Sequence, residues 1–169
     1  MAPRRSSLRP TIEFNLLNKL HKETLREWIF DAMKLYEGQR VEFKLIYKGS
    51  RDGFSALSFH LKADDTGPTV TLIRSNDQVF GGFATASWTS SHYRWVRDER
   101  AFLFSLTHGR RYIQTNNTPD ELDLGKSLYH HKDYLVAFGA GHDLLVASHC
   151  NQNRNSYCNI RTTFCTSLS

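Results

Sequence analysis

The stretch AFLFSLT at residues 101–107, which follows Asp98, Glu99 and Arg100, reads as a strand that is apolar on both faces. Side chains alternate between the two faces of a strand, so Phe102 and Phe104 share one face and Leu103 points to the other. A strand that shows neither face to water has to lie between two layers of structure. The stretch therefore predicts a central strand in a layered, β-rich domain.

Runs with the same period-two alternation, rich in β-branched and aromatic residues, continue on both sides of this stretch. Turn-forming Gly, Asp, Asn and Pro separate them. Several short strands at close spacing with few helices are typical of an antiparallel sandwich. The predicted strands are VEFKLIYK (41–48), ALSFHLK (56–62), TVTLIRS (69–75), the region VFGGFATASW (79–88), AFLFSLT (101–107), RRYIQT (110–115), DYLVAFG (133–139) and DLLVAS (143–148).

One segment has the period of a helix. Between residues 16 and 37 apolar side chains recur mostly at steps of three and four, and Gly38 follows as a stop signal. The sequence thus predicts an α+β, mostly β fold. We expect a two-sheet antiparallel β-sandwich with an N-terminal helix and short peripheral helices, in a single domain over residues 11–169.

The composition is that of a folded chain, because 40% of its 169 residues are hydrophobic. No apolar run approaches the roughly 20 residues of a membrane-spanning helix, so we expect no membrane insertion. The net charge is +5, and Arg4, Arg5 and Arg9 supply three of these charges in an acid-free tail, residues 1–10. The rest is nearly balanced, which argues against a nucleic-acid-binding face and for a basic arm suited to acidic surfaces.

Three parts of the chain go beyond a generic β pattern. They are YKGSRDGFSALSFH (47–60) with GPTVTLIRSNDQVFGGF (67–83), then Trp88 with DERAFLFSL (98–106), and finally AFGAGHDLLVASHCNQNRNSYCN (137–159). In this order and spacing they resemble the TLDc domain, the module shared by oxidation-resistance proteins and several Rab-GTPase-activating relatives. The resemblance covers residues 11–159, most of the chain, and implies the architecture better than it implies a chemistry.

Two glycine-containing sites within these parts predict local structure. Arg51, Asp52 and Gly53 lie between two predicted strands and are expected to form a tight hairpin turn with Gly53 at positive φ. Gly81 and Gly82 lie inside a strand, where two residues without side chains indicate a bulge or a close backbone approach.

The chain departs from the family pattern at its C-terminus. TLDc domains usually continue into strands that close the sandwich, whereas this sequence runs out at NIRTTFCTSLS (159–169). We therefore expect shortened C-terminal strands. A missing strand would leave a sheet edge unpaired, and we expect a protein partner to cover that edge.

Cys150 is the candidate redox residue, because His149 precedes it and a nearby imidazolium lowers the pKa of a thiol. Neighbours on a strand point to opposite faces, however, so His149 and Cys150 would not face each other there. The remaining thiols, Cys158 and Cys165, carry weaker signals, and we expect all three to be reduced. The histidines around them lack the ligand spacing of a zinc site, so no metal is predicted.

Other polar clusters have structural explanations. Asp52, Asp98 and Asp143 adjoin turns or strand ends, where aspartates cap backbone N–H groups. The aromatic and basic cluster around Tyr93 and Trp95 resembles a base-stacking surface, but we expect a loop that packs Trp95 onto the body. We predict no nucleic-acid binding and no cofactor.

These features together predict a non-enzymatic protein-interaction module in the cytoplasm. What the resemblance implies is docking on the vacuolar proton-pumping ATPase (V-ATPase) and a role in oxidative-stress resistance. The basic tail and the loops around residues 52–54, 80–83 and 138–143 are expected to make the contacts. The predicted partner-binding residues are Arg4, Arg5, Arg9, Asp52, Gly53, Phe54, Phe80, Gly81, Gly82, Phe138, Gly139, Gly141 and Asp143.

Two alternative functions stay open from the sequence. One is a structural component of a cytoskeletal or ciliary microtubule assembly, docked on an acidic surface through the basic tail. The other is a thiol-dependent antioxidant enzyme that uses Cys150 as its nucleophile.

Overall fold

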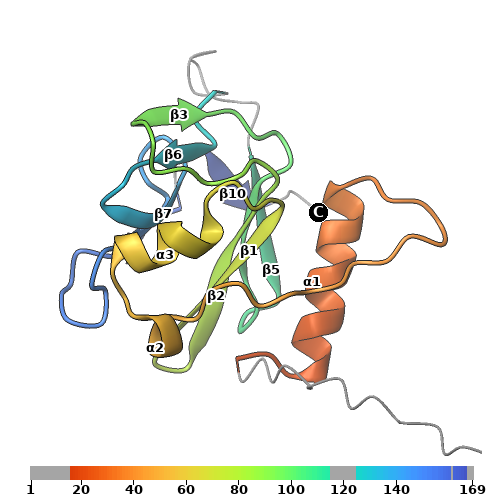
Figure 1. Cartoon of the computed structure of the whole chain (residues 1–169). Helices are drawn as coiled ribbons and strands as arrows, with labels where there is room; N and C mark the ends of the chain where they lie inside the picture. Colours follow the sequence, from red (N-terminus) through yellow and green to blue (C-terminus); the bar gives the residue numbers. More distant parts are fainter. Residues whose placement is uncertain (1–15, 115–124, 161, 167–169) are drawn as a thin grey trace, which may run out of the picture.

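The structure, a computed structural model, describes residues 16–114, 125–160 and 162–166. Its elements form three layers: a long helix, a central sheet, and a second sheet flanked by two short helices (Figure 1). Each sheet has five antiparallel strands, so the mostly β sandwich predicted from the sequence is confirmed.

The first sheet has the strand order β1-β2-β4-β5-β10, which makes β4 its central strand. Phe102 and Phe104 of β4 pack toward the long helix, and Leu103 packs toward the second sheet. The prediction of a central strand buried on both faces is therefore confirmed. The bounds are β1 (Thr69–Ser75), β2 (Gln78–Ala84), β4 (Phe102–Ser105), β5 (Arg110–Gln114) and β10 (Phe164–Thr166).

The second sheet has the order β3-β6-β7-β8-β9 and lies across from the first. Val136, Phe138 and Leu144 point from it into the core between the sheets. Trp88 crosses this core, with its ring 5.4 Å from that of Phe138 and its Nε1 donating to Thr69 at 3.0 Å. The bounds are β3 (Arg94–Val96), β6 (Leu128–His130), β7 (Tyr134–Phe138), β8 (Leu144–Ala147) and β9 (Tyr157–Cys158).

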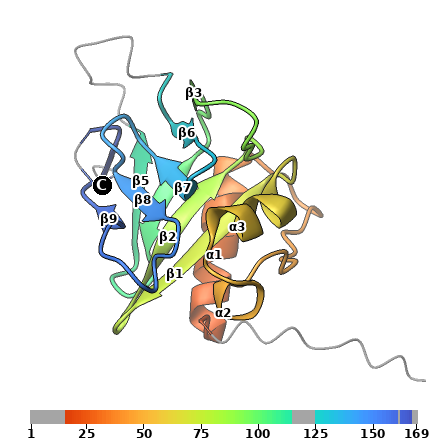
Figure 2. The same ribbon diagram turned by 60° about the vertical axis from the view of Figure 1, so that its left-hand side comes forward.

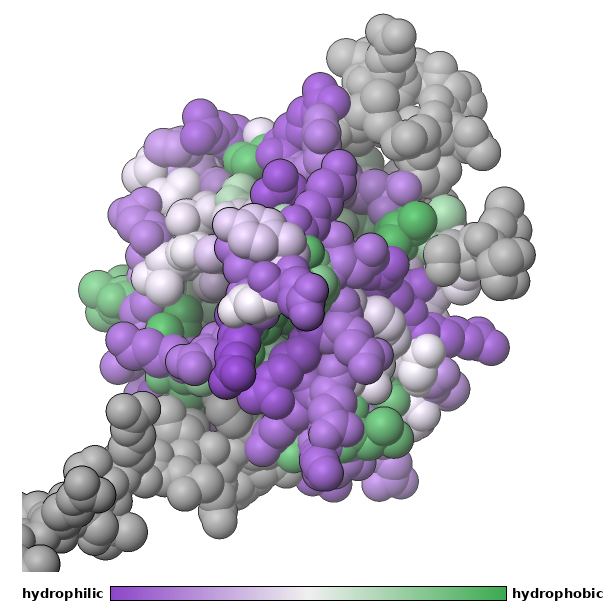
Figure 3. All heavy atoms as spheres, turned by 90° about the vertical axis from the view of Figure 1, so that its right-hand side faces the viewer, coloured by the Kyte–Doolittle hydropathy of each residue, from purple (hydrophilic) through white to green (hydrophobic). Residues whose placement is uncertain are grey.

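The N-terminal helix, α1 (Lys19–Ala32), is shorter than the predicted 16–37. Asn18 caps it by accepting from the His21 amide at 2.7 Å, and Leu25 and Ile29 are its buried anchors. Arg111 fastens it to the first sheet by donating to Asp31 at 2.7 Å. Figure 3 shows the α1 side of the molecule, where hydrophilic side chains dominate and hydrophobic ones are scattered.

The sequence ALSFHLK is a helix, α3 (Ala56–Ala63), so the strand predicted at 56–62 is wrong. The physical reason is the cap: Ser55 accepts from the Ser58 amide at 3.0 Å and starts a helical turn. Ala56, Phe59 and Ala63 then recur at helical steps and are buried against the second sheet.

The segment 41–48 forms no strand either, although its alternating pattern predicts one. Val41 and Phe43 pack with the α1 core, whereas Ile46 and Tyr47 pack with the core between the sheets. The segment therefore crosses from one layer to the other, and such a path keeps it out of a sheet (Figure 1).

The turn predicted at residues 51–53 is not a hairpin. It is a single helical turn, α2 (Gly49–Asp52), and it connects the crossing segment to α3. The predicted positive φ of Gly53 is confirmed, at 94°. The glycine pair in β2 makes a close backbone approach without a bulge, since β2 stays in register with β1 and β4 through Gly81 and Gly82.

Four short strands of the structure were absent from the prediction: β3, β6, β9 and β10. Arg94–Val96 in particular is a strand paired with β6, where the sequence predicts a loop. β10 pairs with β5 through Phe164 opposite Gln114, so the described C-terminal residues extend the first sheet at that edge. Strands of two to three residues are too short to show a period-two pattern.

Candidate functional site

The predicted partner-binding residues separate into a buried and an accessible group. Gly81 and Gly82 lie inside β2, so the segment 80–83 is a strand and not a loop. Phe138, Gly139 and Asp143 are buried in the second sheet and the turn after β7. Partly or fully accessible positions are Asp52, Gly53, Phe54, Phe80 and Gly141; Arg4, Arg5 and Arg9 lie outside the described residues.

The accessible Asp52 organises the turn in front of α3. Its carboxylate accepts from the Lys48 amide at 2.8 Å and pairs with Arg51 at 2.7 Å and Lys62 at 3.8 Å. The Arg51 hydrogen bond, followed by that of the Lys48 amide, holds the pKa of Asp52 well below its usual range. Asp52 therefore works as a structural cap, and it leaves two basic side chains beside α3.

Tyr47 stabilises the same turn through a hydrogen bond. Its hydroxyl donates to the Gly53 carbonyl at 2.6 Å. Burial first, and then the nearby Cys150 and Asp52, raise the pKa of Tyr47 to about 12. The phenol stays protonated and keeps Gly53 and Phe54 in a fixed position at the start of α3.

The outer face of α3 carries two exposed leucines. Leu57 is 69% exposed and Leu61 is 78% exposed, the highest value for a large apolar side chain among the described residues. They are four residues apart, so they lie one turn above the other on the same side of the helix. An apolar pair of this kind, beside the charged Lys62 and Arg51, is typical of a protein contact.

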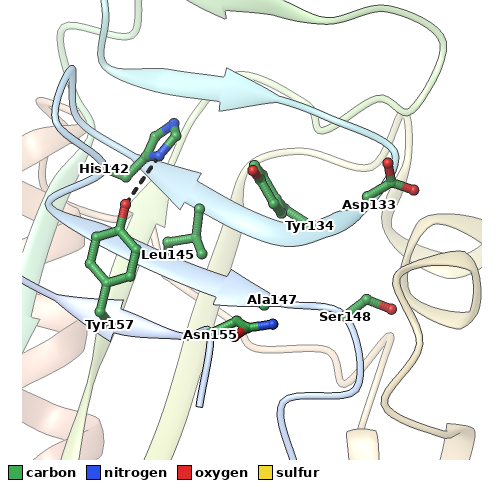
Figure 4. A pocket seen from close by; sticks show the side chains of 8 residues that line it. All are labelled: Asp133, Tyr134, His142, Leu145, Ala147, Ser148, Asn155 and Tyr157. Carbon is green, nitrogen blue, oxygen red and sulfur yellow. Dashed lines mark hydrogen bonds between the residues drawn. The ribbon is translucent and has the colours of Figure 1, made fainter. Parts of the chain in front are cut away.

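A hollow of about 360 Å³ opens on the outer face of the second sheet, between β7, β8 and β9 (Figure 4). Tyr134, His142 and Tyr157 stand around it, and Leu145 and Ala147 lie at its base. The Tyr157 hydroxyl is hydrogen-bonded to Nδ1 of His142 at 3.3 Å. Burial, and then the charge of His131, lower the pKa of His142, so its ring stays neutral near pH 7.

Aromatic rings continue from this hollow across the sheet. His131 is stacked between Tyr93 and Tyr134, with ring centroids 4.5 Å apart on both sides. Trp95 lies 4.7 Å from Tyr129, and both lie within 5.5 Å of His142. Rigid aromatic rings give large contact area at little cost in side-chain entropy, which suits a binding surface.

The hollow lies next to the start of α3, the helix that carries the two leucines. The Ala56 amide at the start of α3 donates to Oγ of Ser148 at 3.0 Å, and Ser148 lines the hollow. Figures 1 and 2 both show α3 beside β7. We call Leu57, Leu61 and the hollow with Tyr134, His142 and Tyr157 the α3 surface. The sequence does not predict this surface, because the pattern at Leu57 and Leu61 predicts a strand.

Asp98 and Asp143 cap backbone groups, as predicted. Asp98 accepts from the amides of Thr85 and Ala86, at 2.6 and 2.9 Å. Asp143 accepts from the amides of Thr162 and Thr163, at 2.9 and 2.8 Å. Both carboxylates are buried and accept hydrogen bonds from backbone amides, so they are not placed to contact a partner.

Cys150 is partly buried, and its burial raises the pKa of the thiol. A raised pKa lowers the fraction of thiolate at neutral pH, and the thiolate is the reactive form. Cys158 lies at an exposed position of β9, and partial desolvation of its thiol, and then Asp143, raise its pKa. Neither environment is the electropositive kind that activates a cysteine.

His60, Asp64 and Ser90 form a hydrogen-bonded chain that differs from a catalytic triad. Asp64 lies at its centre, 2.6 Å from Nδ1 of His60 and 2.7 Å from the Ser90 hydroxyl. Nε2 of His60 faces the carbonyls of His131 and Tyr134, so no serine faces the imidazole. Within the described ranges no cluster of His, Cys, Asp and Glu fits a metal ion.

His130 lies on the opposite side of β6 from the aromatic rings and is buried, at 3% exposure. Burial, and then the positive charges of Arg94 and His92, lower the pKa of His130 to about 4. The folded protein thus binds the proton more weakly than the unfolded chain, whose histidines titrate near pH 6.5. The stability that follows is complete above about pH 6.5 and is lost as pH falls toward 4.

The change His130→Phe should flatten this acid dependence. Between about pH 6.5 and pH 4 we expect the unaltered protein to lose about 2 kcal/mol through His130, less than the full shift implies because the folded ring is only half protonated at pH 4. Urea unfolding at several pH values measures this. Folding also lowers the pKa of His142, and its contribution to the pH dependence of stability is the same in both proteins. Equal pH slopes for the two proteins would contradict the assignment.

The family model of the TLDc domain matches residues 13–169. The match covers essentially the whole chain, so this antiparallel sandwich belongs to the TLDc domain family. A search of curated proteins found no match.

Proposed function

We propose that this TLDc domain is a non-enzymatic interaction module in the cytoplasm that docks on a larger assembly through the α3 surface. The proposed assembly is the V-ATPase, and the proposed consequence is resistance to oxidative stress. Both the assembly and the consequence rest on membership of the family. The site residues themselves support the proposed mode of action, which is binding of a partner without catalysis.

The observation that carries the proposal is the exposure of Leu57 and Leu61 on α3. Each leucine that a partner covers contributes about 1.5–3 kcal/mol of binding free energy. The hollow beside them offers a pocket for one partner side chain, and central pockets of this kind hold the hot spots of interfaces. Arg51 and Lys62 share the single carboxylate of Asp52, and the positive charge left in excess favours a partner surface with acidic residues.

Several observations support a role without catalysis. Burial raises the pKa of Cys150, the Asp carboxylates cap the backbone, and the His60 chain lacks a nucleophile beside its imidazole. No helix in the described part of the chain is long and apolar enough to cross a membrane. Contact with a membrane-bound pump is therefore proposed through its protein subunits.

The test is binding of purified V-ATPase to the full chain and to the double variant Leu57→Glu/Leu61→Glu. Placing two carboxylates in an apolar contact should weaken binding by about 100-fold or more, while thermal unfolding stays near that of the unaltered chain. Leu20→Glu is the matched control, because Leu20 is 68% exposed and belongs to α1, which packs in a different core cluster from α3. Equal affinities for the double variant and the control would contradict the α3 surface.

The same preparations distinguish the alternative functions. Cosedimentation with microtubules that is lost when residues 1–10 are removed would replace the V-ATPase by a filament as the partner. Peroxide consumption that is lost in Cys150→Ser would replace the docking role by a thiol enzyme. We expect neither result.

A further inference from the structure

A second hollow, of about 440 Å³, lies on the far side of β6 from the aromatic rings. The turn after α3, the segment 86–92, β3 and β6 surround it. It is lined largely by polar side chains, including four Ser and Thr hydroxyls, and is separate from the α3 surface.

His130 lines this hollow with an unusual lack of partners. The side chain is 3% exposed, and neither Nδ1 nor Nε2 is hydrogen-bonded to any residue that the structure describes. Buried polar side-chain atoms nearly always have a partner, because an unpaired one costs about 1–3 kcal/mol. Both nitrogens are shielded from solvent in this state, so a ligand that supplies the missing bond has to shift the ring or the rim of the hollow as it binds.

Arg94 is the neighbour of His130 across the sheet. The two residues face each other in the register of β3 and β6, so their side chains lie on the same side of the sheet. Arg94 is exposed and forms no ion pair with a described carboxylate. His92 adds a further basic group at the rim, with Nδ1 2.7 Å from the Ser91 hydroxyl.

Two carboxylates, those of Asp64 and Asp65, also line the hollow. Asp64 is already engaged by His60 at 2.6 Å and by the amide and hydroxyl of Ser90 at 2.8 and 2.7 Å. Asp65 lies exposed on the turn after α3. At the His130 ring the effect of Arg94 is larger than that of Asp64.

We propose that this hollow is an oxyanion-binding site in which Arg94 and His130 hold a carboxylate or phosphate group. Arg94 supplies charge-assisted hydrogen bonds, for which a guanidinium fork suits a planar carboxylate or a phosphate. His130 donates from a ring nitrogen that otherwise has no partner. The bound negative charge favours the protonated imidazole, so ligand and proton bind together.

The experiment uses the full chain and follows the ring signals of His130 by NMR during titration with inorganic phosphate and, separately, with acetate. We expect saturation with a dissociation constant of about 1 mM for phosphate and a rise in the pKa of His130 on binding. Saturation by both ions identifies a carboxylate-type group as a ligand as well. Saturation by phosphate alone restricts the site to phosphate groups.

Three variants make the result specific. Arg94→Gln should weaken phosphate binding by about tenfold or more, and His130→Phe, followed through the His92 ring signals, should weaken it similarly while keeping the fold. Arg97→Gln is the matched control, because Arg97 is exposed and already paired with Glu99. The site is refuted if neither ion binds, or if Arg94→Gln binds phosphate as well as Arg97→Gln does.

The oxyanion site is independent of the proposed docking function. The double variant Leu57→Glu/Leu61→Glu should bind phosphate as the unaltered chain does, because its leucines lie outside this hollow. Failure of V-ATPase binding with phosphate binding intact would therefore overturn the docking proposal alone.

Discussion

The Asp143→Ala variant is expected to unfold about 10 °C below the unaltered protein, a loss of about 3–4 kcal/mol. Asp143 is 0% exposed and accepts from the amides of Thr162, Thr163 and Phe164, at 2.9, 2.8 and 3.3 Å. Removing the carboxylate leaves buried N–H donors without an acceptor, and each costs about 1–3 kcal/mol before the segment relaxes. Differential scanning calorimetry gives the shift directly.

Asp133→Ala is the control for this substitution. Asp133 lies on the turn before β7, its side chain is 61% exposed, and it pairs with its neighbours Lys132 and His131. Exposed pairs of this kind contribute about 1 kcal/mol or less. If both variants unfold at the same temperature, Asp143 does not hold the segment that leads into β10.

The second large effect is expected from Gly81→Ala, which should destabilise the domain by about 3 kcal/mol. A Cβ at Gly81 would overlap the carbonyl oxygen of Thr71 on the neighbouring β1 and lie 3.1 Å from the Phe104 ring. Both obstacles are fixed, since one is backbone and the other is buried core. The pair β1–β2 would have to open, and urea unfolding measures the cost.

Gly109→Ala separates a steric effect from the general effect of replacing a glycine. Gly109 lies before β5 with φ 59°, and a Cβ there meets no atom within 4 Å. Its replacement should cost about 1 kcal/mol, through the backbone conformation alone. Losses of the same size for the two variants would show that β1 and β2 are not as close at Gly81 as the structure has them.

The prediction of β4 from the sequence succeeded because the residues themselves carry the information. Phe102, Leu103 and Phe104 are large and apolar in succession, and only a strand covered on both sides buries all three. Period-two alternation predicted β1, β2, β5, β7 and β8. Burial of alternate residues is a local property, so a local pattern reveals it.

The prediction failed at residues 56–62, and the α3 surface therefore could not be predicted from the sequence. A strand would place Leu57, Phe59 and Leu61 on one buried face, whereas the helix turns Phe59 inward and the leucines outward. The available signal was Ser55, a strong N-cap residue in front of apolar residues at helical steps. A run of seven residues fits both periods, and the cap decides between them.

The crossing segment 41–48 and the hollows could not be predicted from the sequence for a different reason. Whether an alternating segment finds a pairing partner depends on strands far away in the chain, and no local pattern reports that. The pairing of Arg94 with His130 likewise depends on the register of β3 with β6. Sites assembled from distant segments become visible only once the fold is known.

Amide hydrogen exchange of the full chain, free and bound to the V-ATPase, tests the central claim most directly. Docking through the α3 surface predicts slower exchange on binding across residues 55–63 and 145–157, with α1 unchanged. Slower exchange confined to α1 or to the first sheet would place the partner elsewhere and contradict the account.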